Sequence, residues 1–161
     1  MAVHKLILDN VFDEVSYTLI GIHCMLEDYR VAYLLNKYLE ISLTRKSSDL
    51  DFSNGNSAYA IFEWEDRKHL TTWNLIANIF KKEEFKETSY SSLFSSKESL
   101  IKTYNLLPEY KQVNYFLKID NEYNLKEEKY ILNRILRIPQ IVTAYSVDAN
   151  QLKSKENLIF S

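Results

Sequence analysis

Hydrophobic and polar positions alternate along much of the chain, and their period changes from strand-like to helical and back. The segment 3–9 looks like a short strand, and 16–24 is an apolar run rich in strand-forming residues, so we expect a strand in each. Gly21 lies inside the second run, where the backbone is closely approached or bulges. Apolar residues then follow a helical period, at Val31, Leu34, Leu35, Tyr38 and Leu39. This spacing predicts a helix at about 26–38.

The middle of the chain has the period of β-structure. Residues 41–45 alternate and predict a short strand, which leads into a polar loop and the strong turn signal at 54–56, Asn-Gly-Asn. The segments 57–65 and 70–80 also alternate and are separated by a polar turn at 66–69. We expect an antiparallel hairpin in which Ala58, Ala60, Phe62 and Trp64 share one face and Trp73 faces inward from the second strand.

Residues 81–98 are polar and rich in serine, which predicts a mobile loop. A strand is expected at 99–107, and Pro108 is well placed to begin one helical turn at 108–112. The alternation of 113–119 predicts another strand.

The last third of the chain predicts a second helix and two further segments. The helix is expected at about 125–137, with Leu125, Leu132, Ile135 and Leu136 as its inward stripe. Pro139 ends it, a strand follows at 140–147, and the apolar residues 157–160 dock at the end.

The order of these elements predicts the fold class. Runs of strands with two segregated helices indicate a single α+β domain over 1–161, in which an antiparallel sheet packs against two main helices on one face. A β-α-β crossover is expected near the C-terminus.

Glycine is scarce, and this restricts the chemistry. The chain of 161 residues has 2 glycines, where average usage gives roughly 11. Gly21 and Gly55 are too far apart for a phosphate-binding loop or a dinucleotide fingerprint. We therefore expect no nucleotide motif and no cofactor.

Charge and cysteine usage indicate the compartment and class of partner. The formal net charge is −2, so the chain has no overall basic character of the kind that marks nucleic-acid-binding domains. Cys24 is the single cysteine, which fits a reducing compartment. The N-terminal apolar run is too short for a secretory signal, and no run reaches the length of a membrane span. We expect a cytoplasmic protein with no membrane partner.

The segment 107–115 reads LPEYKQVNY. It resembles the signature of the IPExxxVDY family, with Leu107 in place of Ile and Asn114 in place of Asp. Further likeness is carried by AVHKLILD, IHCMLEDYRVAYLLN, FEWED, YFLKI, TAYSVD and LKSKENLIF. The family consists of small, single-domain bacterial proteins of uncharacterised function. The resemblance therefore implies membership of this family but does not indicate an activity.

The signature segment supplies the candidate binding residues, which are Pro108, Glu109, Tyr110 and Tyr115. Asn114 indicates a structural position, a turn or sheet hydrogen bond, because Asn in place of Asp removes the charge and most of the chemistry of a general base or metal ligand. Glu109 is expected to cap the turn at Pro108 or to pair with a nearby lysine, Lys111.

No motif for metal binding or nucleophilic catalysis is present, so we name no catalytic residue and no metal ligand. The histidines are His4, His23 and His69. His23 and Cys24 are neighbours and point to opposite faces of a strand, which prevents a shared metal. We expect Cys24 in the core and His23 as a hydrogen-bonded group at a strand end.

Two alternatives stay open beside the main interpretation. Glu63, Glu65 and Asp66 together would suit a metal-dependent hydrolase, whereas a solvated strand face explains the same spacing. Aromatic residues on candidate strands, Tyr59, Trp73 and Tyr115, would suit base stacking in an RNA-binding accessory protein, although aromatic rows of this kind are usually core.

The main interpretation is a non-enzymatic binding or regulatory module that acts through protein–protein contacts. The chain contains 12 tyrosines and 2 tryptophans, residue types that are enriched at protein interfaces. The partner is a second copy of the chain or another protein.

Overall fold

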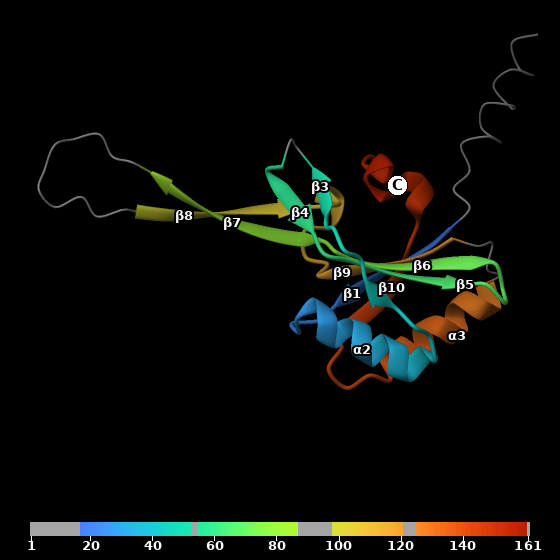
Figure 1. The fold of residues 1–161 in the computed structure, drawn as a ribbon. Helices are drawn as coiled ribbons and strands as arrows, with labels where there is room; N and C mark the ends of the chain where they lie inside the picture. The colour runs from blue at the N-terminus through green and yellow to red at the C-terminus, as the bar shows by residue number, and fades with distance from the viewer. Residues whose placement is uncertain (1–16, 53–54, 87–97, 121–124, 161) are drawn as a thin grey trace, which may run out of the picture.

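The centre of the molecule is a six-stranded antiparallel sheet with strand order β10-β1-β9-β6-β5-β2 (Figure 1). The computed structural model describes residues 17–52, 55–86, 98–120 and 125–160. The strand expected at 3–9 lies outside these ranges. The strands of the sheet are β1 (Thr18–His23), β2 (Thr44–Arg45), β5 (Ile61–Asp66), β6 (Thr71–Ala77), β9 (Tyr115–Asp120) and β10 (Thr143–Val147).

Two helices cover one face of this sheet, α2 (Asp28–Leu39) and α3 (Leu125–Leu136) (Figure 1). They bury a first core between helices and sheet, to which Val31, Leu35, Ile131, Ile135, Leu75 and Leu117 contribute. The predicted fold class, an α+β arrangement with two helices on one face of an antiparallel sheet, is therefore confirmed. The predicted stripe of α3 is wrong in part, because Leu136 is exposed while Ile131 is buried.

The opposite face of the sheet is also covered, which the sequence analysis did not predict. A second core lies beneath a two-stranded ribbon, β3 (Leu50–Phe52) with β4 (Ser57–Tyr59), and three short 3-10 helices. These helices are η1 (Pro108–Tyr110), η2 (Ala149–Gln151) and η3 (Lys155–Leu158). Leu158 is fully buried there, so the expected docking of 157–160 is confirmed.

Burial on both faces alters the expected hairpin. The segment 57–65 is interrupted at Ala60, so that β4 and β5 belong to different sheets. Ile61, which alternates with Phe62 and so faces away from the helices, is buried in the second core. The opposed pair Trp64 and Trp73 lies toward the helices, with ring centroids 6.0 Å apart, as the pattern predicted.

The C-terminal crossover has one strand inserted in it. β9 and β10 each pair with β1 in antiparallel fashion, so they run parallel to one another with β1 between them. α3 connects β9 and β10 on the helical face. The expected β-α-β unit is present as this split form.

A second two-stranded sheet projects from the body as a long hairpin arm (Figure 1). We call β7 (Ile79–Lys86) and β8 (Glu98–Asn105) together the arm. The expected loop at 81–98 is therefore wrong for 81–86, which continue β7, and for Glu98, which begins β8, whereas 87–97 lie outside the described residues. A polar sequence forms strands here because both faces of the arm meet water, so no apolar alternation is required.

The turn and glycine positions follow the sequence expectations. Gly55 has φ +83°, a left-handed conformation that glycine adopts without strain, and it lies in the expected turn. At Gly21 the Tyr145 ring comes within 3.4 Å of the point that a Cβ would occupy, so the backbone is closely approached there. Within the described ranges, no helix has both the length and the apolar character that a membrane span requires.

Candidate interaction surface

The arm meets the body at Asn78, a fully buried residue between β6 and β7. Its backbone N–H donates to the Asn114 carbonyl at 2.9 Å, and its own carbonyl accepts from the Leu106 N–H at 2.9 Å. Its side-chain oxygen accepts from the Leu107 N–H at 2.9 Å, and its amide donates to the Tyr110 and Val113 carbonyls, each at 2.8 Å. One asparagine thus forms hydrogen bonds with several backbone groups of the segment 106–114, which follows the arm.

Asn114, in the signature segment, has the structural role expected of it. Its side-chain oxygen accepts a hydrogen bond from the Cys24 N–H at 3.0 Å, and its backbone N–H donates to the Ile22 carbonyl at 3.1 Å. These contacts continue the sheet beyond the end of β1. The position needs a hydrogen-bond acceptor and not a negative charge.

Three of the candidate binding residues, Pro108, Glu109 and Tyr110, line one cavity of about 440 Å³. Opposite them are His23 and Tyr145, whose ring nitrogen Nε2 and hydroxyl are 3.0 Å apart, so His23 is hydrogen-bonded at the strand end as expected.

Glu109 lies in the first turn of η1, as expected, but its side chain has a different partner from the one predicted. Its carboxylate neither caps η1 nor pairs with Lys111 among the contacts of the described residues; it accepts hydrogen bonds from the Ser154 hydroxyl at 2.8 and 2.9 Å. Glu109 therefore anchors the C-terminal segment, which lies far from it in sequence.

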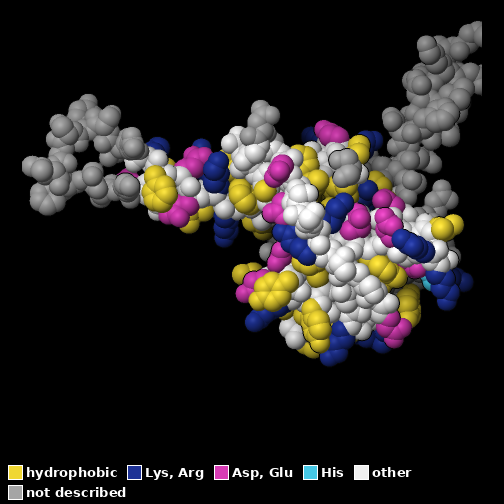
Figure 2. All heavy atoms as spheres, in the orientation of Figure 1, with side chains coloured by type: hydrophobic (Ala, Val, Ile, Leu, Met, Phe, Trp, Pro, Cys, Tyr) yellow, Lys and Arg dark blue, Asp and Glu magenta, His cyan; other side chains and the backbone are white. Residues whose placement is uncertain are grey.

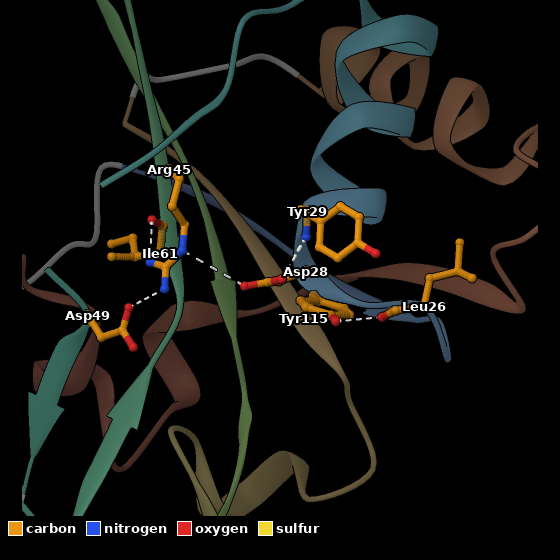
Figure 3. Close-up of polar contacts among 7 residues, drawn as sticks. All are labelled: Leu26, Asp28, Tyr29, Arg45, Asp49, Ile61 and Tyr115. Carbon is orange, nitrogen blue, oxygen red and sulfur yellow. Dashed lines mark hydrogen bonds and ion pairs between the residues drawn. The ribbon is translucent and has the colours of Figure 1, made fainter. Parts of the chain in front are cut away.

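The fourth candidate, Tyr115, lies on the other side of the sheet. Its hydroxyl donates to the Leu26 carbonyl at 2.6 Å, and the contact is drawn in Figure 3. Burial, together with the negative charge of Asp28, raises the pKa of Tyr115 to about 12. The ring and hydroxyl fix the connection between β1 and α2 beside the base of the arm.

That connection forms one wall of a groove of about 190 Å³, which we call the root groove. Met25, Leu26 and Ala77 supply apolar surface from the body, and Ile79 and Lys81 supply it from the arm. Met25 is 88% exposed, so part of the wall of the groove is an apolar side chain that lies mostly in solvent. Its complete lining is Cys24, Met25, Leu26, Ala77, Ile79, Lys81, Asn114 and Tyr115.

One face of the arm continues outward from the root groove, and we call it the open face. It consists of Ile79, Lys81, Glu83 and Phe85 of β7 and the directly opposed Asn105, Thr103, Ile101 and Ser99 of β8. Phe85 is 62% exposed and Ile101 is 68% exposed. Among the described residues, neither Lys81 nor Glu83 has an ion-pair partner, although both are exposed.

The other face of the arm carries an ion pair between its two strands. Lys102 pairs with Glu84 across the two strands at 2.7 Å, which lowers the pKa of Glu84 and raises that of Lys102. Near the body, Phe80 packs against Tyr104 of the arm and Tyr59 of β4. Figure 2 shows hydrophobic side chains interspersed with charged ones along the arm.

The carboxylates considered for metal chemistry do not converge. Glu63 pairs with Lys46 at 3.3 Å and Glu65 is exposed. Asp66 accepts from the backbone of the β5–β6 turn and from His69 Nδ1 at 2.6 Å. Burial opposes its ionisation, but these hydrogen bonds outweigh it and lower its pKa. Across the part of the chain that is described, no three His, Cys, Asp or Glu are grouped to hold a metal ion.

The side chains considered for base stacking are core residues. Tyr59, Trp73 and Tyr115 are all buried, so none presents a ring face to a base. Cys24 is likewise buried in the first core, as expected, and its thiol donates to the Gln140 carbonyl at 3.5 Å.

Sequence reasoning missed the residues that define the arm and its base. Asn78 was read as one residue in a continuous strand, and Phe85 and Ile101 were not singled out. A signal was present in the order Phe80-Lys-Lys-Glu-Glu-Phe85, in which two basic and two acidic residues lie between aromatic ends.

Comparison of the chain with protein-family models, with curated proteins and with solved structures gave no match in any of the three.

Proposed function

We propose that the chain is a binding module that acts through protein–protein contacts, and that the open face of the arm is its contact surface. The observation that carries the proposal is the exposure of Phe85 and Ile101 on a hairpin that extends away from the body. Exposed apolar side chains grouped on one face are typical of interaction sites.

The energetics of a lone hairpin support this assignment. A two-stranded sheet without a core behind it is marginally stable in water. Among the described residues, the ring contacts of the arm, Phe80 with Tyr59 and with Tyr104, lie near its base, and farther out Phe85 and Ile101 are exposed. Contact with a partner would bury Phe85 and Ile101 and supply the missing packing.

The remaining expectations fit a module of this kind. A reducing compartment suits the buried free thiol of Cys24, and we propose a cytoplasmic location on that basis. The resemblance of 107–115 to the IPExxxVDY signature stays a prediction. The Asn78 side chain accepts a hydrogen bond from the Leu107 N–H and donates to the Tyr110 and Val113 carbonyls of this segment, which attaches the segment to the base of the arm.

The test compares a variant of the open face with a matched surface variant. Phe85→Ser with Ile101→Thr removes the exposed apolar groups from the arm. Leu70→Ser removes a leucine that is 88% exposed, more than either arm residue, from the β5–β6 turn at the other end of the sheet (Figure 1). The tagged proteins are used for affinity capture, and each captured protein is purified and its binding measured directly.

We expect the Leu70 variant to bind as the unchanged protein does, and the double variant to bind at least about tenfold more weakly, as loss of two central apolar contacts would cause. Equal binding by the double variant would contradict the proposal. Failure of the unchanged protein to bind any protein, itself included, would also contradict it.

A further inference from the structure

We infer that the partner of the open face is a second copy of this chain, and that two arms pack face to face in antiparallel orientation. The inference rests on the proposed function and names its partner. The order of residues on the open face, their charges and the position of the root groove carry it.

The β7 side of the open face is complementary to itself when reversed. Its order is Ile79, Lys81, Glu83, Phe85, with apolar residues at the ends and opposite charges in the middle. Two such rows in antiparallel orientation, centred at position 82, place each Lys81 opposite Glu83 of the second copy. A two-fold axis makes every contact twice, so both lysines and both glutamates gain a partner.

The same arrangement accounts for the apolar ends. Ile79 and Phe85 are each three residues from the centre at position 82, about 10 Å along a strand. Phe85 of one copy therefore lies over Ile79 of the other, at the root groove with its exposed Met25. Ile101 faces Thr103 of the second copy in the neighbouring row.

The other face of the arm does not offer this symmetry. Its β7 row is Phe80, Lys82, Glu84 and Lys86, so reversal places an aromatic ring opposite a lysine. Glu84 is already paired with Lys102, and Phe80 is packed between Tyr59 and Tyr104. Among the described residues, the open face is the one whose β7 row pairs apolar with apolar and Lys with Glu on reversal, and it carries the more exposed apolar side chains, Phe85 and Ile101.

The test uses charge reversal at two exposed positions, which leaves the fold intact. Lys81→Glu places Glu opposite Glu83 of the second copy, and Glu83→Lys places Lys opposite Lys81. Sedimentation velocity over a concentration series measures self-association. We expect each single variant to associate at least about tenfold more weakly than the unchanged protein, because attraction becomes repulsion in two symmetric pairs.

Mixing the two single variants provides the decisive measurement. A pair made of one K81E chain and one E83K chain has an acidic row opposite a basic row, so we expect the mixture to form heterodimers with the affinity of the unchanged protein or better. The double variant K81E/E83K also restores complementarity and should self-associate. Lys82→Glu makes the same change in charge on the other face and should leave association unchanged.

The inference is overturned if the unchanged protein is monomeric at every concentration, or if mixing the two variants does not restore association. In either case the proposed function stands when Phe85→Ser with Ile101→Thr still abolishes binding of a different captured protein. The proposed function is also contradicted only if no protein, including a second copy of the chain, binds through the open face.

Discussion

The central strand β9 and the arm strand β7 are both regular antiparallel strands, but they differ in what lies on either side of them. β9 has Phe116 toward the second core and Leu117 toward the first, and both side chains are fully buried. β7 beyond Phe80 has lysine and glutamate on both faces, with one aromatic residue near its outer end. β9 lies between two packed layers, whereas β7 has water on both faces.

The comparison shows that strand formation and strand stability have separate origins. Backbone pairing is complete in both regions, from Thr18 opposite Ile119 in the sheet to Lys86 opposite Glu98 in the arm. Burial of apolar surface, the dominant favourable term in folding, extends over the sheet, whereas in the arm it involves Phe80 and Tyr104 near the base. The arm depends on cross-strand pairs and on its attachment at Asn78, and it leaves apolar groups free for a partner.

The largest expected difference in stability comes from making the same substitution, Leu→Ala, once in the sheet and once in the arm. Leu117→Ala removes a fully buried leucine from the sheet and should lower the free energy of unfolding by about 3 kcal/mol. Leu100→Ala, on the arm and 44% exposed, should lower it by about 0.5 kcal/mol or less. Denaturant unfolding of both variants measures the difference, and equal losses would remove the distinction between sheet and arm.

A smaller effect is expected at the joint between the regions. Asn78→Ala leaves the Leu107 N–H and the carbonyls of Tyr110 and Val113 without their buried partner, and should cost about 2 kcal/mol. Amide exchange at Leu107 should become faster in the same variant.

The matched control for the joint is Asn105→Ala, at the base of the arm. Asn105 makes one exposed hydrogen bond to the Lys111 carbonyl, so its loss should cost about 0.5 kcal/mol or less. If the two asparagine variants had the same stability, Asn78 would not be the attachment point that we describe.

The smallest effect is confined to the arm and depends on pH. The hydrogen bond and charge of Lys102 lower the pKa of Glu84 below its ordinary value of 4.5. A carboxyl group whose pKa is lower in the folded state stabilises that state above the ordinary value, and the stabilisation is lost as the pH falls through the folded pKa. Cross-strand contacts of the arm should therefore weaken in acid while those of β9 with β1 and β6 persist.

Nuclear Overhauser effects between β7 and β8 measure this pH dependence. Glu84→Gln should abolish it, whereas Glu98→Gln, at an exposed position opposite Lys86 at the outer end of the arm, should preserve it. An unchanged pH profile in the Glu84 variant would show that the ion pair does not stabilise the arm.

Much of the body was predictable because its patterns are local. The helical spacing from Val31 to Leu39 corresponds to α2, and the alternation from Val113 to Ile119 corresponds to β9. The turn at 66–69 and the facing tryptophans also follow from nearby residues. In each case the spacing of the apolar residues indicates which side chains face a core, and in the structure those side chains lie in a core or pack against it.

The candidate site was predicted less well because its contacts join distant segments. Glu109 bonds Ser154, which is 45 positions away, and Asn78 bonds a segment about 30 positions away. No local pattern indicates such partners. The mobile loop predicted at 81–98 was wrong for 81–86 because a polar run in solvent forms a strand wherever another strand pairs with it.

By itself, the sequence determined the fold class, the two helices, the principal strands and a glycine content too low for a glycine-rich loop motif. Those properties follow from side-chain periodicity and backbone freedom, which act over a few residues. The tertiary structure alone decided that both faces of the sheet are covered, that Asn78 ends the sheet and begins the arm, and that Lys81, Glu83, Phe85 and Ile101 share an open face. Those features depend on strand register and long-range packing, in which residues far apart in sequence come into contact.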